Sequence, residues 1–182
     1  DQHNYFGIMR ILVTGGAGFI GSHTCVLLLR LGFQVIIYDS FFNSSLNVIP
    51  RILSICSSIP NSKENLNIVK GDIRDRNLLD SVFKEAILDG FPIDLVIHFA
   101  GLKSVSESVI NPFIYWDVNV CGTRTLLDVM RSNNCFSIIF SSSATVYGNP
   151  DQVPITEDSR ISPINPYGQT KAAVEYLLND IY

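Results

Sequence analysis

A chain of 182 residues is long enough for a domain with a substantial core, and its 47% apolar and 16% charged residues exclude a disordered chain. The 13 basic residues are scattered and the formal net charge is −4, which argues against a nucleic-acid-binding surface. No apolar run reaches the roughly 18 residues of a membrane span. Four widely spaced cysteines indicate buried, reduced thiols of a cytoplasmic protein rather than metal ligands: Cys25, Cys56, Cys121 and Cys135.

Strand-like segments recur from Arg10 onward, each short, apolar or β-branched, and bounded by Gly, Asn, Asp or Ser. Their apolar positions run almost unbroken, as in strands that are buried on both faces of a sheet. The predicted strands are Arg10–Thr14, Gln34–Tyr38, Leu66–Lys70, Asp94–Phe99 and Phe136–Ser141. The predicted helices are Gly18–Leu31, Arg74–Leu88, Asn111–Ser132 and a last one from Pro166 to the chain end. This alternation predicts an α/β fold with a doubly wound parallel sheet of Rossmann type.

Two connections are polar and irregular. Ser54–Asn65 is expected to be a surface excursion. Thr145–Asn165 contains Pro150, Pro154 and Pro163 and is too long for a simple connection, and loops of that length are often functional.

Four glycines stand within seven residues directly after the first predicted strand, in GGAGFIG. Gly15 and Gly16 permit a tight turn, Gly18 allows a pyrophosphate to approach the positive helix N-terminus, and Gly21 allows the helix to pack on the strand. Glycines also serve ordinary turns, so the motif is weak by itself. Between a strand and a helix it predicts dinucleotide binding.

Asp39 ends the second predicted strand, 18 residues after Gly21, where the dinucleotide motif requires an acid at about 20 residues. Its carboxylate would accept hydrogen bonds from an adenosine ribose and repel a 2′-phosphate. Ser40, Phe41 and Phe42 add no cation. These features favour NAD over NADP, although Asp39 alone could equally be a strand-end cap.

Tyr167 and Lys171 stand four residues apart at the start of the last predicted helix and therefore share one of its faces. A free tyrosine has a pKa of about 10, and a neighbouring ammonium favours the phenolate, which makes Tyr167 a candidate general base. Ser143 follows the fifth strand, where ligands bind in such sheets. The alternatives are ordinary helix packing for the Tyr/Lys pair and strand capping for the serine. His98, inside an apolar strand, is interpreted as a core residue.

Together these motifs resemble the extended short-chain dehydrogenase/reductase family. Within it, four further stretches resemble the UDP-glucose 4-epimerase family, over the N-terminal half of such enzymes: HFAGLKSVSES (His98–Ser108), SSSATVYG (Ser141–Gly148), GDIRD (Gly71–Asp75) and NVCGT (Asn119–Thr123). The resemblance implies a catalytic set of Ser143, Tyr167 and Lys171, of which Ser143 and Tyr167 also contact the substrate. It implies an NAD site formed by Gly15, Gly18, Phe19, Ile20, Gly21, Asp39, Asn43, Ser44, Asp72, Ile73, Phe99, Ala100, Lys103, Asn119, Tyr167 and Lys171.

The resemblance further implies a domain organisation and a reaction. Residues 1–8 would be a leader or tag remnant and residues 9–182 the NAD-binding domain. The chain stops inside its last helix, so we expect a truncated piece that lacks a C-terminal substrate domain. The implied reaction is epimerisation at C4 of UDP-glucose or UDP-galactose through a transient 4-keto sugar, and the implied assembly is a homodimer formed through the helices at 111–132 and 166–182.

The sequence also has features of two other kinds of protein, a nucleotide-sugar 4,6-dehydratase and a non-catalytic NAD-binding module. Nucleotide-sugar 4,6-dehydratases are similar but carry Asp-Glu directly after the active-site serine or threonine, where this chain has Ala144 and Thr145. A non-catalytic NAD-binding module would need no Ser/Tyr/Lys set, and it stays open for a truncated chain.

Overall fold

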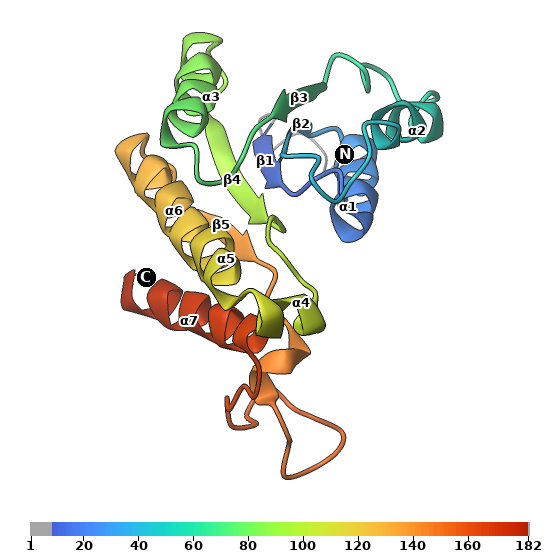
Figure 1. The fold of residues 1–182 in the computed structure, drawn as a ribbon. Coiled ribbons are helices and arrows are strands. Elements are labelled where there is room, and N and C mark those ends of the chain that lie inside the picture. The colour runs from blue at the N-terminus through green and yellow to red at the C-terminus, as the bar shows by residue number, and fades with distance from the viewer. Residues whose placement is uncertain (1–8, 182) are drawn as a thin grey trace. The chain divides into compact units, whose positions relative to one another are not determined.

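The computed structural model describes residues 9–181 (Figure 1); residues 1–8, expected to be a leader or tag remnant, lie outside them. The strands are β1 (Arg10–Thr14), β2 (Gln34–Asp39), β3 (Leu66–Lys70), β4 (Ile93–His98) and β5 (Ile138–Phe140). The helices are α1 (Phe19–Arg30), α2 (Val48–Ile55), α3 (Arg76–Leu88), α4 (Val105–Ile110), α5 (Pro112–Tyr115), the π-helical η1 (Trp116–Cys121), α6 (Gly122–Ser132), the 3₁₀-helical η2 (Ala144–Tyr147) and α7 (Pro166–Ile181). No helix formed by these residues is long and apolar enough to cross a membrane.

The chain divides into two compact units. The first consists of the described residues up to Ala100 together with Thr125–Phe140, and it contains the whole sheet. The second consists of Gly101–Arg124 and the described residues from Ser141 onward, and it contains α4, α5, η1, η2 and α7.

The five strands of the first unit are all parallel and lie in the order β3-β2-β1-β4-β5. In the centre of the sheet, Leu12 of β1 pairs with Ile36 of β2 and Val96 of β4. This arrangement confirms the predicted doubly wound α/β fold. The strand order reverses between β1 and β4, and ligands of such sheets bind outside the carboxyl ends of the strands at that point.

Helices cover both faces of this sheet, with α1 and α2 on one side of the strands and α3 on the other (Figure 1). One face of β1 and β2 contributes to a buried cluster, which includes Val13 and Val35 of the strands. The cluster also contains Cys25 and Leu29 of α1 and Ile52 of α2. On the other side, α3 is tied to α6 by a hydrogen bond from Arg76 Nη1 to Asp128 Oδ2, and to the residue after α6 by one from Asn133 Nδ2 to Asp80 Oδ1 at 2.9 Å.

The expectation that every strand is buried on both faces is wrong for the outer strands. β1 is buried at all five positions, but only Leu66 is buried in β3, and no residue is fully buried in β5. β5 is also shorter than predicted. Because β3 and β5 lie at the two edges, they have fewer neighbours than β1, although their sequences are as apolar as those of central strands.

The helices also depart from the prediction. The predicted helix Asn111–Ser132 is present as α5, η1 and α6 in succession, with π-helical geometry in the middle. The helices α2 and α4 were missed, although Ser104 and Glu107 form the S-x-x-E start signal of α4, and the Ser104 side chain accepts from the Glu107 backbone N–H. Cys25, Cys56 and Cys135 are buried, as predicted, but Cys121 is exposed.

Candidate functional site

The turn between β1 and α1 depends on glycines because it passes very close to other backbone. Gly15 has a φ of +67°, and a Cβ at this position would lie 2.6 Å from the backbone nitrogen of Ala100. A Cβ on Gly21 would lie 2.3 Å from the Gly15 carbonyl oxygen. The glycines thus bring the start of α1 against the end of β4, and they bring together the predicted residues Gly15, Gly21 and Ala100.

The N-terminus of α1 carries features that suit an anion. Gly18 is its N-cap, no side chain caps the helix, and its first turn has no acidic residue. Among residues 9–181, a Cβ on Gly18 would meet only the Gly15 oxygen within 4 Å, at 3.2 Å, so these residues otherwise leave the space in front of Gly18 open. The first backbone N–H groups of a helix have no intrahelical partner. Those of Phe19 and Ile20 are therefore suited to a pyrophosphate, and the site fits the predicted group.

Asp39 is buried at the end of β2 and has three hydrogen-bond partners. Its carboxylate accepts from the Ala17 N–H at 2.9 Å, the Phe41 N–H at 2.8 Å and the Ser44 hydroxyl at 3.0 Å. Since a carboxylate offers about four acceptor sites, one remains for a ligand hydroxyl. The sequence offered two interpretations of Asp39, a ribose contact and a strand-end cap. Asp39 also holds the glycine turn and the following loop, in which Asn43 is exposed.

Asp72 and Ile73, predicted at the adenine, follow β3. The Asp72 carboxylate pairs with Arg74 Nη2 at 2.7 Å, and hydrogen bonds from Arg74 lower the pKa of this carboxyl below its usual range. The backbone carbonyl of Asp72 accepts a hydrogen bond from the Tyr38 hydroxyl at 2.9 Å, which ties the segment after β3 to β2. Ile73 is buried. An adenine contact by these residues stays a prediction.

The end of β4 is fixed to β1 through Thr14. The Phe99 N–H donates to the Thr14 carbonyl at 2.9 Å, and the Ala100 N–H reaches its hydroxyl at 3.4 Å. The same hydroxyl lies 2.6 Å from Nδ1 of His98, which is buried. His98 is thus a hydrogen-bonded core residue, as interpreted from the sequence.

In the second unit, α7 carries Tyr167 and Lys171, both buried. The Lys171 Nζ donates to the carbonyl of Ser141 at 2.9 Å, and burial lowers the pKa of this lysine to about 8. The Tyr167 ring packs edge-on against Tyr115, and its backbone N–H donates to the Ser108 hydroxyl at 3.2 Å. The Tyr167 hydroxyl makes no hydrogen bond to any residue within 9–181, so it is available to a ligand.

Ser143 is the N-cap of η2. Its oxygen accepts from the Thr145 N–H at 3.3 Å and from the Thr145 hydroxyl at 2.9 Å. Neither bond uses the Ser143 proton, which can still be donated to a ligand. The capping alternative and the substrate-binding interpretation are therefore compatible.

Asn119 lies in η1 and is buried. Its Oδ1 accepts from the Leu102 N–H at 2.8 Å, and its Nδ2 donates to the Leu102 carbonyl at 3.0 Å and the Thr170 hydroxyl at 3.1 Å. The side chain thus joins the Leu102 segment to α7, a role that sequence spacing did not indicate. Lys103, next to this segment, is exposed.

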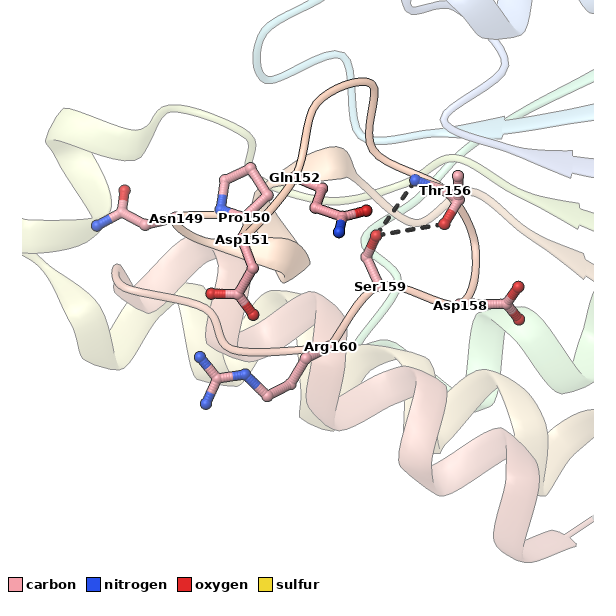
Figure 2. Close-up of a pocket in the computed structure, with 8 residues that line it drawn as sticks. All are labelled: Asn149, Pro150, Asp151, Gln152, Thr156, Asp158, Ser159 and Arg160. Atoms are coloured by element: carbon pink, nitrogen blue, oxygen red, sulfur yellow. Dashed lines mark hydrogen bonds between the residues drawn. The ribbon is translucent and has the colours of Figure 1, made fainter.

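The long loop after η2 encloses a polar hollow of about 350 Å³ (Figure 2). Within it, the Ser159 hydroxyl accepts from the Thr156 N–H at 3.2 Å. Its lining consists of Asn149, Pro150, Asp151, Gln152, Thr156, Asp158, Ser159 and Arg160. None of the predicted site residues lines it.

A parallel sheet of this order, with a glycine turn at its reversal point and an uncapped helix after it, defines a nucleotide-binding protein of Rossmann type. The chain belongs to the GDP-mannose 4,6 dehydratase family, whose profile matches residues 12–182.

Similar proteins within this fold are UDP-glucose 4-epimerases. The chain is 50% identical over 172 residues to the UDP-glucose 4-epimerase of Neisseria meningitidis serogroup A, covering 94% of the chain and 48% of the relative. It is 47% identical over 172 residues to the bifunctional UDP-glucose 4-epimerase and UDP-xylose 4-epimerase 1 of Pisum sativum, covering 94% and 47%. The UDP-glucose 4-epimerase structure from Stenotrophomonas maltophila, with bound NAD and formylated UDP-arabinopyranose, matches with a TM-score of 0.85 and 44% identity over 95% of this chain and 48% of that one. The chain therefore spans about half the length of the relatives it matches.

Proposed function

We propose that the whole protein interconverts UDP-glucose and UDP-galactose by epimerisation at C4, with NAD as a bound cofactor. The observation that carries this proposal is the presence of Ser143, Tyr167 and Lys171 in one compact unit, in a chain 46–50% identical to several UDP-glucose 4-epimerases. The first unit of the chain supplies the residues proposed for the dinucleotide. The second unit supplies those proposed for proton transfer.

The geometry of the first unit supports the residues proposed for NAD. The backbone amides of Phe19 and Ile20 would hold the pyrophosphate, and the free acceptor capacity of Asp39 would hold the adenosine ribose. The bound cofactor supplies reversible hydride acceptance at C4 of the sugar. The remaining task of the protein is to position the sugar and to move one proton.

Tyr167 is the proposed general base. Its unbonded hydroxyl would accept the proton of the sugar 4-hydroxyl as C4 is oxidised and return it when C4 is reduced. Lys171 lies one helical turn along α7, on the same face of the helix as Tyr167. Burial lowers the pKa of Lys171 to about 8, which still leaves most of its population charged at pH 7.

Ser143 is the proposed orienting group for the sugar. With its oxygen occupied by Thr145, it donates its proton to the substrate oxygen. The neighbouring positions argue against dehydration of the sugar. A 4,6-dehydratase needs an acid and a base directly after this serine, whereas Ala144 has no functional group and the Thr145 hydroxyl is bonded to Ser143.

A homodimer and a cytoplasmic location complete the proposal. Large apolar side chains are exposed on the helices of the second unit, with Phe113 at 89% and Tyr176 at 55% exposed. Such surfaces commonly bind another protein. The buried free thiols of Cys25, Cys56 and Cys135 suit a reducing compartment. Light scattering on the whole protein measures the assembly, and a monomer at micromolar concentration would contradict the dimer.

Incubation of the whole protein with UDP-glucose, followed by separation of the sugar nucleotides, tests the reaction. The proposal predicts UDP-galactose and no 4-keto-6-deoxy sugar. The deoxy product would show a dehydratase, and unchanged substrate, with NAD bound to the protein, would favour a non-catalytic binding module.

A further inference from the structure

Glu175 lies on α7 in register with Tyr167 and Lys171. Tyr167, Lys171 and Glu175 follow one another at intervals of four residues and so share one face of the helix. Nothing in the sequence motifs singles out Glu175. Its carboxylate oxygen Oε1 accepts a hydrogen bond from the Ser142 hydroxyl, 33 residues earlier in the chain. Ser142 directly precedes Ser143.

Two further contacts join the segment around Ser143 to α7. One turn before Glu175, the Lys171 Nζ donates to the Ser141 carbonyl at 2.9 Å. At the start of the helix, a Cβ on Gly168 would lie 2.8 Å from the Thr145 carbonyl oxygen, so η2 packs directly on the helix backbone there. The two residues before Ser143 are therefore each held by a different side chain of α7.

Ser143 itself has no such attachment. Within residues 9–181, its hydroxyl oxygen accepts only from Thr145, and its backbone carbonyl accepts from the Val146 N–H at 3.1 Å, so these bonds all stay within the same short segment. The position of its hydroxyl along α7 must therefore be set by its neighbours. Lys171 holds Ser141 by its backbone carbonyl. Glu175 holds Ser142 by its hydroxyl, and this hydrogen bond is partly buried, where hydrogen bonds are stronger than in water.

We propose that Glu175 is a positioning residue for Ser143, because it holds Ser142 against α7 and thereby sets where the Ser143 hydroxyl meets the sugar. The proposal rests on the epimerase function proposed above. It predicts that loss of the Ser142–Glu175 bond slows turnover without weakening cofactor binding, since none of the residues proposed for the dinucleotide pyrophosphate or adenosine ribose takes part in it.

The kinetic test uses the whole protein. Glu175→Ala should lower kcat about tenfold with KM for the UDP-sugar changed less than about twofold, because the interaction orients the reacting group. Glu175→Gln keeps an acceptor oxygen for Ser142 and should retain activity within about threefold. Ser142→Ala should match Glu175→Ala, and the double variant should be no slower than the slower single one. Glu157→Ala, an exposed loop acid, serves as the control. An unchanged kcat in Glu175→Ala, equal losses in Ala and Gln, or losses that multiply in the double variant would overturn the proposal.

A second measurement does not depend on activity. Amide hydrogen exchange of residues 141–147 should be faster in Glu175→Ala than in the parent and close to the parent in Glu175→Gln. Unchanged exchange in Glu175→Ala would contradict the anchoring. If the parent protein fails to epimerise while Glu175→Ala still loosens this segment, the proposed function is wrong and the anchoring stands.

Discussion

The two units of the chain prepare for their proposed ligands in different ways. In the first, the groups offered to the dinucleotide are mostly backbone: the Phe19 and Ile20 amides and the open space at Gly18, with one side chain, Asp39. In the second, the groups offered to the sugar are the side chains of Ser143 and Tyr167. Distant partners hold the segments that carry them: the Tyr167 N–H donates to Ser108, and Ser142, next to Ser143, donates to Glu175.

This difference determines what each kind of change should do. A backbone site is damaged by adding atoms, since a single methyl group can occupy the ligand's space. A side-chain site is damaged by removing atoms, since the reacting or anchoring group disappears. The variants below test the contrast, beginning with the largest expected effect.

Tyr167→Phe removes only one oxygen from the second unit. We expect kcat of the whole protein to fall about 10²–10⁴-fold, the usual contribution of a general base, while NAD affinity stays within about threefold. Steady-state kinetics and NAD titration by fluorescence quenching measure the two quantities. Near-normal turnover in the variant would remove Tyr167 from the mechanism.

Gly18→Ala adds one carbon to the first unit. Gly18 has an ordinary φ of −71°, so alanine can adopt its backbone conformation, although its Cβ would lie 3.2 Å from the Gly15 oxygen and require a small shift of the turn. That Cβ would also occupy the proposed pyrophosphate position. NAD affinity should fall at least about tenfold, a loss of about 1.4 kcal/mol.

The matched control for that variant is Gly32→Ala. Gly32 has a φ of +84° with nothing within 4 Å of a Cβ, so alanine there strains the backbone by about 1–2 kcal/mol without meeting any atom. It should lower the unfolding temperature more than Gly18→Ala does and leave NAD affinity unchanged. The reverse pattern would show that Gly18 is structural and not part of the site.

Asp39 is the exception in the first unit, because its function needs a side chain. We expect the parent chain to bind NAD at least about tenfold more tightly than NADP, and Asp39→Ala to bring the two affinities within about threefold. The variant should also lose about 1–3 kcal/mol of unfolding free energy, since the buried Ala17 amide loses its acceptor. Ser44→Ala, which keeps the carboxylate, should retain the preference for NAD. Equal affinities in the parent would contradict the assignment.

The same contrast explains what the sequence could predict. Glycines, a strand-end acid and a Tyr/Lys pair at helical spacing are local patterns, and they led to the parallel sheet and to the candidate residues. The partners of those residues are distant in sequence: Ser142 meets Glu175 and Asn119 meets Thr170 only through the fold. The π-helical geometry around Asn119 has no composition signal. The exposure of β3 and β5 depends on their edge position, which alternation alone does not reveal.

The last of these predictions concerns the pH dependence of stability that the buried lysine of the second unit causes. In the folded chain burial lowers the pKa of Lys171 from 10.5 to about 8, so between these values the unfolded chain binds more protons and stability rises with pH. Relative to Lys171→Met, the parent should therefore gain unfolding free energy as the pH rises through this window, by up to about 3 kcal/mol. Urea unfolding of both chains at pH 7.5 and pH 10 gives the free energy of unfolding of the parent minus that of the variant at each pH. In this difference the contributions of the other titrating groups cancel. A difference that is constant or falls with pH would show that Lys171 is not buried as a charged group.

The most direct test of the proposed reaction follows the C4 hydrogen of the sugar. UDP-galactose that carries deuterium at C4 is converted by the whole protein in ordinary water, and the UDP-glucose formed is analysed by mass spectrometry and NMR. Because C4 is first oxidised and then reduced by the same bound cofactor, we predict that the deuterium is retained at C4. Deuterium lost to the solvent would contradict hydride transfer, and deuterium found at C6 of a 4-keto-6-deoxy sugar would identify a dehydratase instead.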